Sequence, residues 1–131
     1  MGERSSARGV TLDTGALIAF ERGDQRMRQL IREALLSQAI LVIPVGVVAQ
    51  VWRNGRRQVE LGSLLRAGNV RVDPLTQVLA MAIGELCAKR HTGDVIDASV
   101  VLAAHRFHTT VVTSDPDDIR HLDPSLRIRG I

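Results

Sequence analysis

The chain has little of several residue types, and each shortage excludes something. Its 131 residues include one cysteine, Cys87, which excludes an internal disulfide framework and suits a reducing compartment. The longest apolar run, residues 39–49, is too short to span a bilayer and contains Pro44 and Gly46. The first six residues lack the apolar core of a signal peptide. We therefore expect a cytoplasmic protein that does not enter the membrane.

Lysine is almost missing as well, because Lys89 is the only one and the other cations are arginines. The net charge is only +3, although the isoelectric point is about 10.4. Arginine suits phosphate recognition, since its planar guanidinium binds oxygens in pairs. A bias in genome base composition explains the arginines equally well. The charge balance therefore permits a nucleic-acid partner without requiring one.

What the chain does have is a regular alternation of short apolar segments and amphipathic segments, in one domain over residues 1–131 with a loose lead-in at residues 1–8. The apolar segments predict strands at Val10–Leu12, Ile40–Ile43, Val70–Val72 and Thr110–Val112, with a fifth edge strand at Leu126–Ile128. Helical spacing predicts helices at Gly15–Phe20, Gln25–Ser37, Val47 to about Gly55, Arg56–Arg66, Thr76–Arg90, Asp94–Phe107 and Pro116–His121. This order predicts an α/β fold, a three-layer α/β/α sandwich around a parallel, roughly five-stranded sheet.

Four aspartates stand at the edges of these apolar segments. Asp13 and Asp115 each end a strand expected in the middle of the sheet, and Asp94 and Asp97 open the most apolar helix. Ligands of parallel sheets bind beyond the carboxyl ends of the strands. Carboxylates that converge there repel one another unless a cation lies between them. The pattern predicts a site for a hard metal ion, and such sites mostly act on phosphates.

Each aspartate also has a structural interpretation. Asp94 suits the N-cap of a helix with Asp97 in its first turn, and Asp115 is followed by Pro116 at the first helical position. Asp13 differs, because it follows a buried strand, where a carboxylate is costly unless something compensates its charge. Taken singly, the others are better explained as caps than as ligands.

The hydroxyl residues beside these acids have two interpretations that remain open. Thr14, Thr113 and Ser114 could hold water molecules around a magnesium ion, or a scissile phosphate. They could equally cap the local backbone.

The segments Leu12–Ile18, Asp97–Ala104 and Val111–Asp118 together resemble the PIN-domain family, and within it the VapC-type toxins of bacterial toxin–antitoxin pairs. The resemblance covers essentially the whole chain. It implies a five-stranded parallel sheet and a ribonuclease that depends on Mg²⁺ or Mn²⁺. It also implies a homodimer and a cognate antitoxin as partners.

Carried onto this chain, the resemblance assigns the catalytic, metal-binding aspartates to Asp13, Asp97 and Asp115. Asp94, and Asp117 or Asp118, are candidate outer ligands, and Asp94 is equally a candidate cap.

One position departs from the family pattern. The family usually has a glutamate on the helix after the second strand, and this chain offers Gln50. Its amide oxygen accepts a hydrogen bond or touches a metal ion, but it brings no charge and cannot act as a base. We expect weaker metal binding, or reliance on Asp94 instead. The alternative function is therefore a non-catalytic PIN-fold module that binds RNA or protein.

Arg53, Arg56 and Arg57 follow Gln50 and are candidates for holding an RNA backbone, although a solvated basic face or contacts with an acidic antitoxin explain them as well. Aromatic residues are few, so we expect little base stacking. The histidines show no zinc-site spacing, and we expect them at the surface or at helix ends. They are His91, His105, His108 and His121.

Two other enzyme classes share part of the first motif. Asp13-Thr14-Gly15-Ala16 looks like the active-site turn of retroviral-type aspartic proteases, but those are all-β dimers and this chain has long helical patterns. Phosphatases of the haloacid dehalogenase type need a second aspartate two residues after the first, where this chain has Gly15. Neither class fits.

Overall fold

A computed structural model describes residues 9–131 of the protein, and the lead-in expected at residues 1–8 lies outside them. Five parallel strands form one sheet in the order β3-β2-β1-β4-β5. They are β1 (Val10–Leu12), β2 (Leu41–Pro44), β3 (Val70–Asp73), β4 (Thr110–Thr113) and β5 (Ile128–Gly130). The helices are α2 (Thr14–Glu21), α3 (Gln25–Ser37), α4 (Val45–Val51), α5 (Val59–Leu65), α6 (Gln77–Arg90), α7 (Val95–Phe107) and α8 (Pro116–Leu122).

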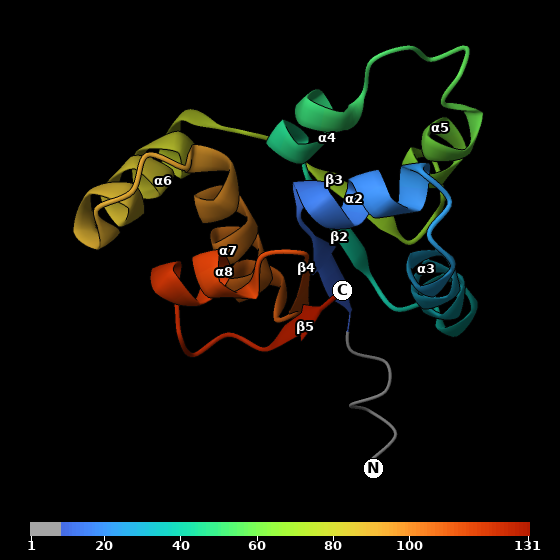
Figure 1. Cartoon of the computed structure of the whole chain (residues 1–131). Helices are drawn as coiled ribbons and strands as arrows, with labels where there is room; N and C mark the ends of the chain where they lie inside the picture. Colours follow the sequence, from blue (N-terminus) through green and yellow to red (C-terminus); the bar gives the residue numbers. More distant parts are fainter. Residues whose placement is uncertain (1–8) are drawn as a thin grey trace.

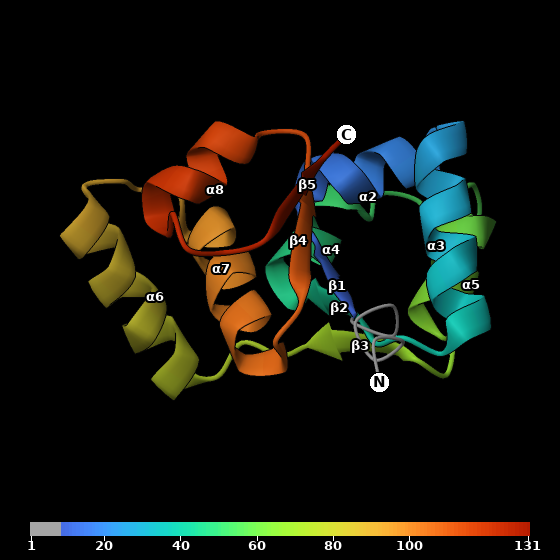
Figure 2. The same cartoon turned by 90° about the horizontal axis from the view of Figure 1, so that it is seen from below.

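The helices cover both faces of the sheet (Figure 1). α6, α7 and α8 lie on one side, and α2, α3 and α5 lie on the other, as the view from below shows (Figure 2). α7 packs directly on β1, β2 and β4, and α6 packs outside it. The predicted three-layer α/β/α sandwich with a five-stranded parallel sheet is therefore confirmed.

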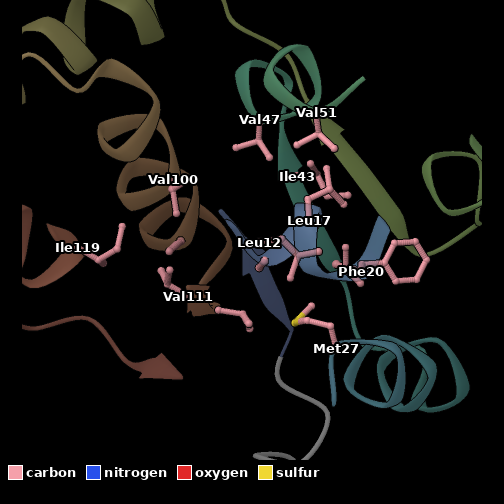
Figure 3. Packing of buried hydrophobic residues seen from close by; sticks show 14 of the residues in the cluster. Leu12, Leu17, Phe20, Met27, Ile43, Val47, Val51, Val100, Val111 and Ile119 are labelled. Carbon is pink, nitrogen blue, oxygen red and sulfur yellow. The ribbon is translucent and has the colours of Figure 1, made fainter. Parts of the chain in front are cut away.

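The core lies where the central strands meet the helices of both layers. Figure 3 shows Leu12 of β1 and Val111 of β4 among side chains such as Leu17 and Val100, which come from α2 and α7. All four are almost or completely buried. Burying side chains of this size stabilises the fold by roughly 1.5–3 kcal/mol each, so the central strands are held firmly.

The order of the strands reverses beside β1. From β1 the chain continues to β2 and β3 on one side, and it returns on the other side of β1 to form β4 and β5. Ligands of such sheets bind beyond the carboxyl ends of the strands beside the reversal, and we call this region, at the ends of β1 and β4, the crevice. Asp13 directly follows β1, and Asp115 comes two residues after the end of β4, so both lie close to strand ends as the sequence predicted.

Several element boundaries differ from the predicted ones. The helix expected at Arg56–Arg66 begins only at Val59, because the buried Gln58 side chain binds the loop backbone before it and residues 54–57 form a turn. The helix expected to reach Gly55 ends at Val51. The last strand is shifted to Ile128–Gly130, because the segment before it closes a turn through the bond from Leu126 N–H to the Asp123 carbonyl.

Candidate metal centre

Asp13 lies at the centre of the crevice and is almost fully buried, with 5% of its surface exposed. Its backbone N–H donates to the carbonyl of Val112 at 3.2 Å, which ties the end of β1 to β4. Its side-chain oxygen accepts from the N–H of Ala16 at 2.8 Å and so caps α2. The carboxyl group is thus held in one orientation at the rim of the sheet.

The pKa of Asp13 is raised above its ordinary value. Burial is the main cause, and the charge of nearby Asp115 adds to it, while the Thr113 hydroxyl and the N–H groups of Ala16 and Ser114 act in the opposite direction. A buried carboxylate is stable only when a cation or several donors compensate its charge. These donors offset the burial only in part.

α7 brings the second pair of acids to the same crevice. Asp94 is the N-cap of α7, and its oxygen accepts from the N–H of Asp97 at 2.9 Å. Burial raises the pKa of Asp97 to about 7, together with the charge and hydrogen bonding of Asp94 and the charges of Asp13 and Asp118. Because Asp13 and Asp118 both act on Asp97, acids from three separate segments lie within electrostatic range of one another.

The aspartates that cap helices in the structure are not all the ones that the sequence indicated. Asp13, which the sequence set apart from the caps, does cap a helix, and Asp94 is a cap as its sequence also allowed. Asp115 occupies the N-cap position of α8 with Pro116 after it, but its side chain makes no capping bond. Its backbone N–H donates to Thr113 Oγ1 at 2.8 Å instead. The Asp115 carboxylate is therefore not committed to the helix.

The two candidates for an outer acid on α8 have different surroundings. The carboxylate of Asp117 is fully exposed and accepts from Arg120 Nη1 at 3.4 Å, one turn along the helix. Asp118 is exposed as well, but its charge contributes to the raised pKa of Asp97. Of the two, Asp118 is therefore the one within electrostatic range of Asp97.

Gln50 lies beside the first acidic motif, where the family has a glutamate. The hydroxyl of Thr14 donates to its side-chain oxygen, which links α4 to the start of α2. On the other side of Thr14, the backbone of Gly15 touches Ser114, since a Cβ at position 15 would lie 2.0 Å from Ser114 Oγ. The hydroxyl residues Thr14 and Ser114 thus line the crevice next to Asp13, and only glycine permits this approach.

Within residues 9–131, five acids around this crevice have no basic partner. None of the ion pairs within residues 9–131 includes Asp13, Asp94, Asp97, Asp115 or Asp118. Within the same residues, no three acidic, histidine or cysteine side chains are grouped closely enough to hold a metal ion as they stand. Mutually repelling carboxylates turn apart, and Mg²⁺ needs only one or two of them because it keeps several waters. The all-oxygen donor set therefore fits a hard divalent cation.

One buried acid was not considered in the sequence analysis. Asp73 ends β3 and is 4% exposed, much like Asp13. Both of its oxygens accept from the guanidinium of Arg106, and Arg71 Nε lies 3.9 Å away. Its position directly after an apolar strand was a signal for it, but the arginine that pairs with it comes from α7. Asp73 is accounted for as a structural ion pair.

The arginines that follow Gln50 lie in the connection between α4 and α5. Arg53 Nη1 donates to the carbonyls of Ala49 and Trp52 at 2.9 and 2.8 Å, which satisfies the end of α4. Arg56 and Arg57 are exposed, and no hydrogen bond or ion pair within residues 9–131 uses their guanidinium groups.

The histidines occupy helix ends, as expected. His91 and His108 are the left-handed C-caps of α6 and α7. His105 pairs with Asp123, and His121 Nε2 lies 2.6 Å from the carbonyl oxygen of Arg90.

The PIN domain model matches residues 10–123 of the chain, which span every acid of the crevice. The chain belongs to the PIN domain family. The resemblance inferred from the three sequence motifs is thereby confirmed. No curated protein matches the chain in sequence. No helix within residues 9–131 is long and apolar enough to cross a membrane.

Solved structures share this fold at low sequence identity. VapBC2 from Rickettsia felis, bound to a DNA fragment from its promoter, has a TM-score of 0.69 at 16% identity, over 94% of this chain and 98% of the other. FitAcB from Neisseria gonorrhoeae has a TM-score of 0.58 at 17% sequence identity, and the match covers 91% of this chain and 95% of the other. FitAB bound to an IR36 DNA fragment has a TM-score of 0.60 at 18% sequence identity, and the match covers 92% of this chain and 94% of the other. At these identities the likeness is one of fold.

Proposed function

We propose that this PIN domain is a ribonuclease that depends on Mg²⁺ or Mn²⁺ and hydrolyses phosphodiester bonds in RNA. The observation that carries the proposal is the pair of carboxyl groups of Asp13 and Asp97, whose pKa values are raised and which have no basic partner within residues 9–131. The raised pKa values mean that burial and neighbouring charges disfavour the ionised form of both carboxyl groups. A divalent cation compensates it, and PIN domains are generally nucleases.

In this proposal Asp13, Asp97 and Asp115 hold the cation. Once bound, a divalent cation lowers the pKa of a water molecule and stabilises negative charge on a phosphate. Asp94 and Asp118 add negative charge around this centre, and Asp118 is favoured over Asp117 because its charge acts on Asp97.

The remaining residues of the crevice orient the substrate. The hydroxyls of Thr14 and Ser114 lie beside Asp13 and are suited to donate to a water molecule or to a phosphate oxygen. Arg53, Arg56 and Arg57 carry positive charge on the connection that follows Gln50, where an RNA backbone would pass. Thr113 acts indirectly, because its hydroxyl holds the backbone of Asp115.

The partners proposed are an antitoxin and a second copy of the chain. The solved structures named above share this fold and are VapBC and FitAB complexes, and this supports the role of a toxin in a VapBC-type toxin–antitoxin pair. Exposed apolar residues at α6, namely Leu75, Val78 and Met81, support association with another protein. Sedimentation of the purified chain tests the homodimer, and co-purification with the product of a neighbouring gene tests the antitoxin.

The alternative is a non-catalytic PIN-fold module that binds RNA or protein. The observation that favours it is Gln50, a neutral amide at the position of the family's glutamate. A module of this kind needs no cation, so its acids would remain without metal at millimolar concentrations.

The deciding experiment is cleavage of structured and unstructured RNAs by the purified chain with Mn²⁺, with Mg²⁺ or with a chelator. We expect metal-dependent cleavage that is lost in Asp97→Asn and retained in Asp117→Asn, a control that removes a nearby but fully exposed carboxylate. Cleavage that survives in the chelator, or equally in Asp97→Asn, would contradict the proposal. If only Gln50→Glu cuts RNA, the chain is the weakened module.

A further inference from the structure

Trp52 lies on a surface that the proposed chemistry does not use. It is the only tryptophan and directly follows α4. Its backbone N–H donates to the Val48 carbonyl at 2.8 Å. The six-membered ring lies against two glycines, because a Cβ on Gly55 would be 2.9 Å from Trp52 Cζ2 and one on Gly62 would be 3.6 Å from Cη2. Even so, 38% of the residue is exposed. The indole thus packs against Gly55 and Gly62 and is partly open to solvent.

The loop that carries Trp52 is fixed by one buried side chain. Gln58 is 8% exposed, and its amide donates to the Val51 carbonyl at 2.9 Å. Its oxygen accepts from the N–H groups of Arg53 and Asn54 at 2.7 and 2.9 Å. A loop held at three backbone points loses little conformational entropy when it binds a ligand. The surface around Trp52 is therefore organised before any ligand arrives.

The charge around Trp52 is positive. Arg56 and Arg57 lie on the same loop and are exposed, without a side-chain partner within residues 9–131. The nearest acid in sequence, Glu60, is occupied by a double hydrogen bond from Arg28 at 2.7 and 2.6 Å. An aromatic ring beside free guanidinium groups is the arrangement that binds single-stranded nucleic acid without regard to sequence.

This surface follows the crevice closely along the chain. Gln50, which accepts from Thr14 next to Asp13, precedes Trp52 by two residues at the end of α4, so the two side chains leave the helix in different directions. Figure 1 shows the connection from α4 to α5 as an arch that begins on the side of the sheet where α4 lies.

We propose that Trp52 is a base-stacking platform for a single-stranded nucleic acid, with Arg56 and Arg57 holding the backbone beside it. This inference deepens the proposed ribonuclease function and rests on it for the choice of nucleic acid over protein as the ligand. It revises the expectation from composition that base stacking contributes little, because one well-supported ring is sufficient for one base.

The first test uses the intrinsic fluorescence of the full chain, which reports on Trp52 alone since there is no other tryptophan and no tyrosine. The probes are a short single-stranded oligouridine and an abasic oligonucleotide with the same number of phosphates, both in chelator so that neither is cut. We expect oligouridine to quench the fluorescence and the abasic strand to leave it unchanged. Equal quenching by both strands, or none by oligouridine, would overturn the platform.

The second test measures oligouridine affinity by anisotropy in Trp52 variants. Trp52→Leu should weaken binding about tenfold, and Trp52→Phe should retain most of it, because stacking needs an aromatic face. Arg56→Ala and Arg57→Ala should each reduce the salt dependence of binding by about one ion. Leu36→Ala is the matched control, since it removes an exposed apolar side chain on α3. Circular dichroism establishes that each variant is folded.

The two proposals fail in different ways in these tests. Binding is measured without metal, so Trp52-dependent binding by a chain that cuts no RNA would overturn the ribonuclease and leave the platform. Unchanged oligouridine affinity in Trp52→Leu, in a chain that cuts RNA, would overturn the platform alone.

Discussion

Asp13 and Asp73 occupy nearly equivalent places in the sheet and have opposite surroundings. Each lies at the carboxyl end of a parallel strand and is about 95% buried. Asp73 has Arg106 and Arg71 beside it, whereas no ion pair within residues 9–131 includes Asp13. Where residues 9–131 provide a basic partner, the acid belongs to the fold. Where they provide none, we propose that the acid binds a cation from solution.

The largest expected effect is the loss of RNA cleavage when an acid near Asp13 is neutralised. Asp97→Asn should lower metal-dependent RNA cleavage by at least about a hundredfold, because the variant loses a ligand charge at the cation site. Stability in chelator should be unchanged or higher, since the substitution removes a repelling carboxylate. Parallel cleavage and thermal unfolding assays measure both. A variant that lost activity because it had unfolded would give no support to the metal site.

The second prediction concerns the paired acid. Arg106→Ala should destabilise the protein by about 2 kcal/mol, because it leaves the buried Asp73 with one weaker partner while Arg106 itself was partly exposed. Metal affinity should be unchanged. Arg120→Ala is the control, since its partner Asp117 is fully exposed and such pairs contribute at most about 1 kcal/mol. Equal destabilisation in both variants would contradict the structural role given to Asp73.

The third prediction concerns the side chain at position 50 and the affinity for Mn²⁺. Gln50→Glu should tighten Mn²⁺ binding by about tenfold, because it adds a carboxylate next to Thr14 without changing the shape of the side chain. In chelator the same variant should be slightly less stable than the wild type. Calorimetric titration measures the affinity, and unchanged affinity would mean that the side chain at position 50 does not reach the cation.

The smallest effect is the pH dependence of stability in chelator. The pKa of Asp97 is raised from 3.8 to about 7 in the folded protein, so the folded state holds a proton that the unfolded state releases between these values. Its contribution to stability therefore falls as the pH rises from about 4 to about 7. The difference between wild type and Asp97→Asn isolates this contribution, which we expect to be no more than about 1 kcal/mol because solvent screens a half-buried carboxyl. A difference that grows in the opposite direction would contradict the raised pKa.

Local sequence patterns predicted most of the fold and the places of Asp13 and Asp115 near strand ends. The apolar runs of β1 and β4, and Pro116 after Asp115, fixed the strands and the start of α8 because these signals act within a few residues. Contacts between distant segments were outside their reach. The late start of α5 depends on the side chain of Gln58, and the neutralisation of Asp73 depends on Arg106, 33 residues away.

The same reason explains which site details were missed. Whether an aspartate before a helix also caps it depends on competing donors: Asp115 makes no cap while its backbone binds Thr113, and Asp13 does cap α2. The packing of the Trp52 ring depends on its closeness to both Gly55 and Gly62. Neither arrangement has a periodic signature in the sequence.

The most direct test of the account measures Mn²⁺ binding by electron paramagnetic resonance in the wild type, in Asp13→Asn and in Asp73→Asn. Asparagine caps helices as well as aspartate does, so Asp13→Asn keeps the cap of α2 and removes only the charge. The account predicts that Asp13→Asn loses the bound Mn²⁺ and Asp73→Asn retains it. Equal binding in all three proteins, or equal loss in both variants, would contradict the claim that the unpaired acids form the metal centre.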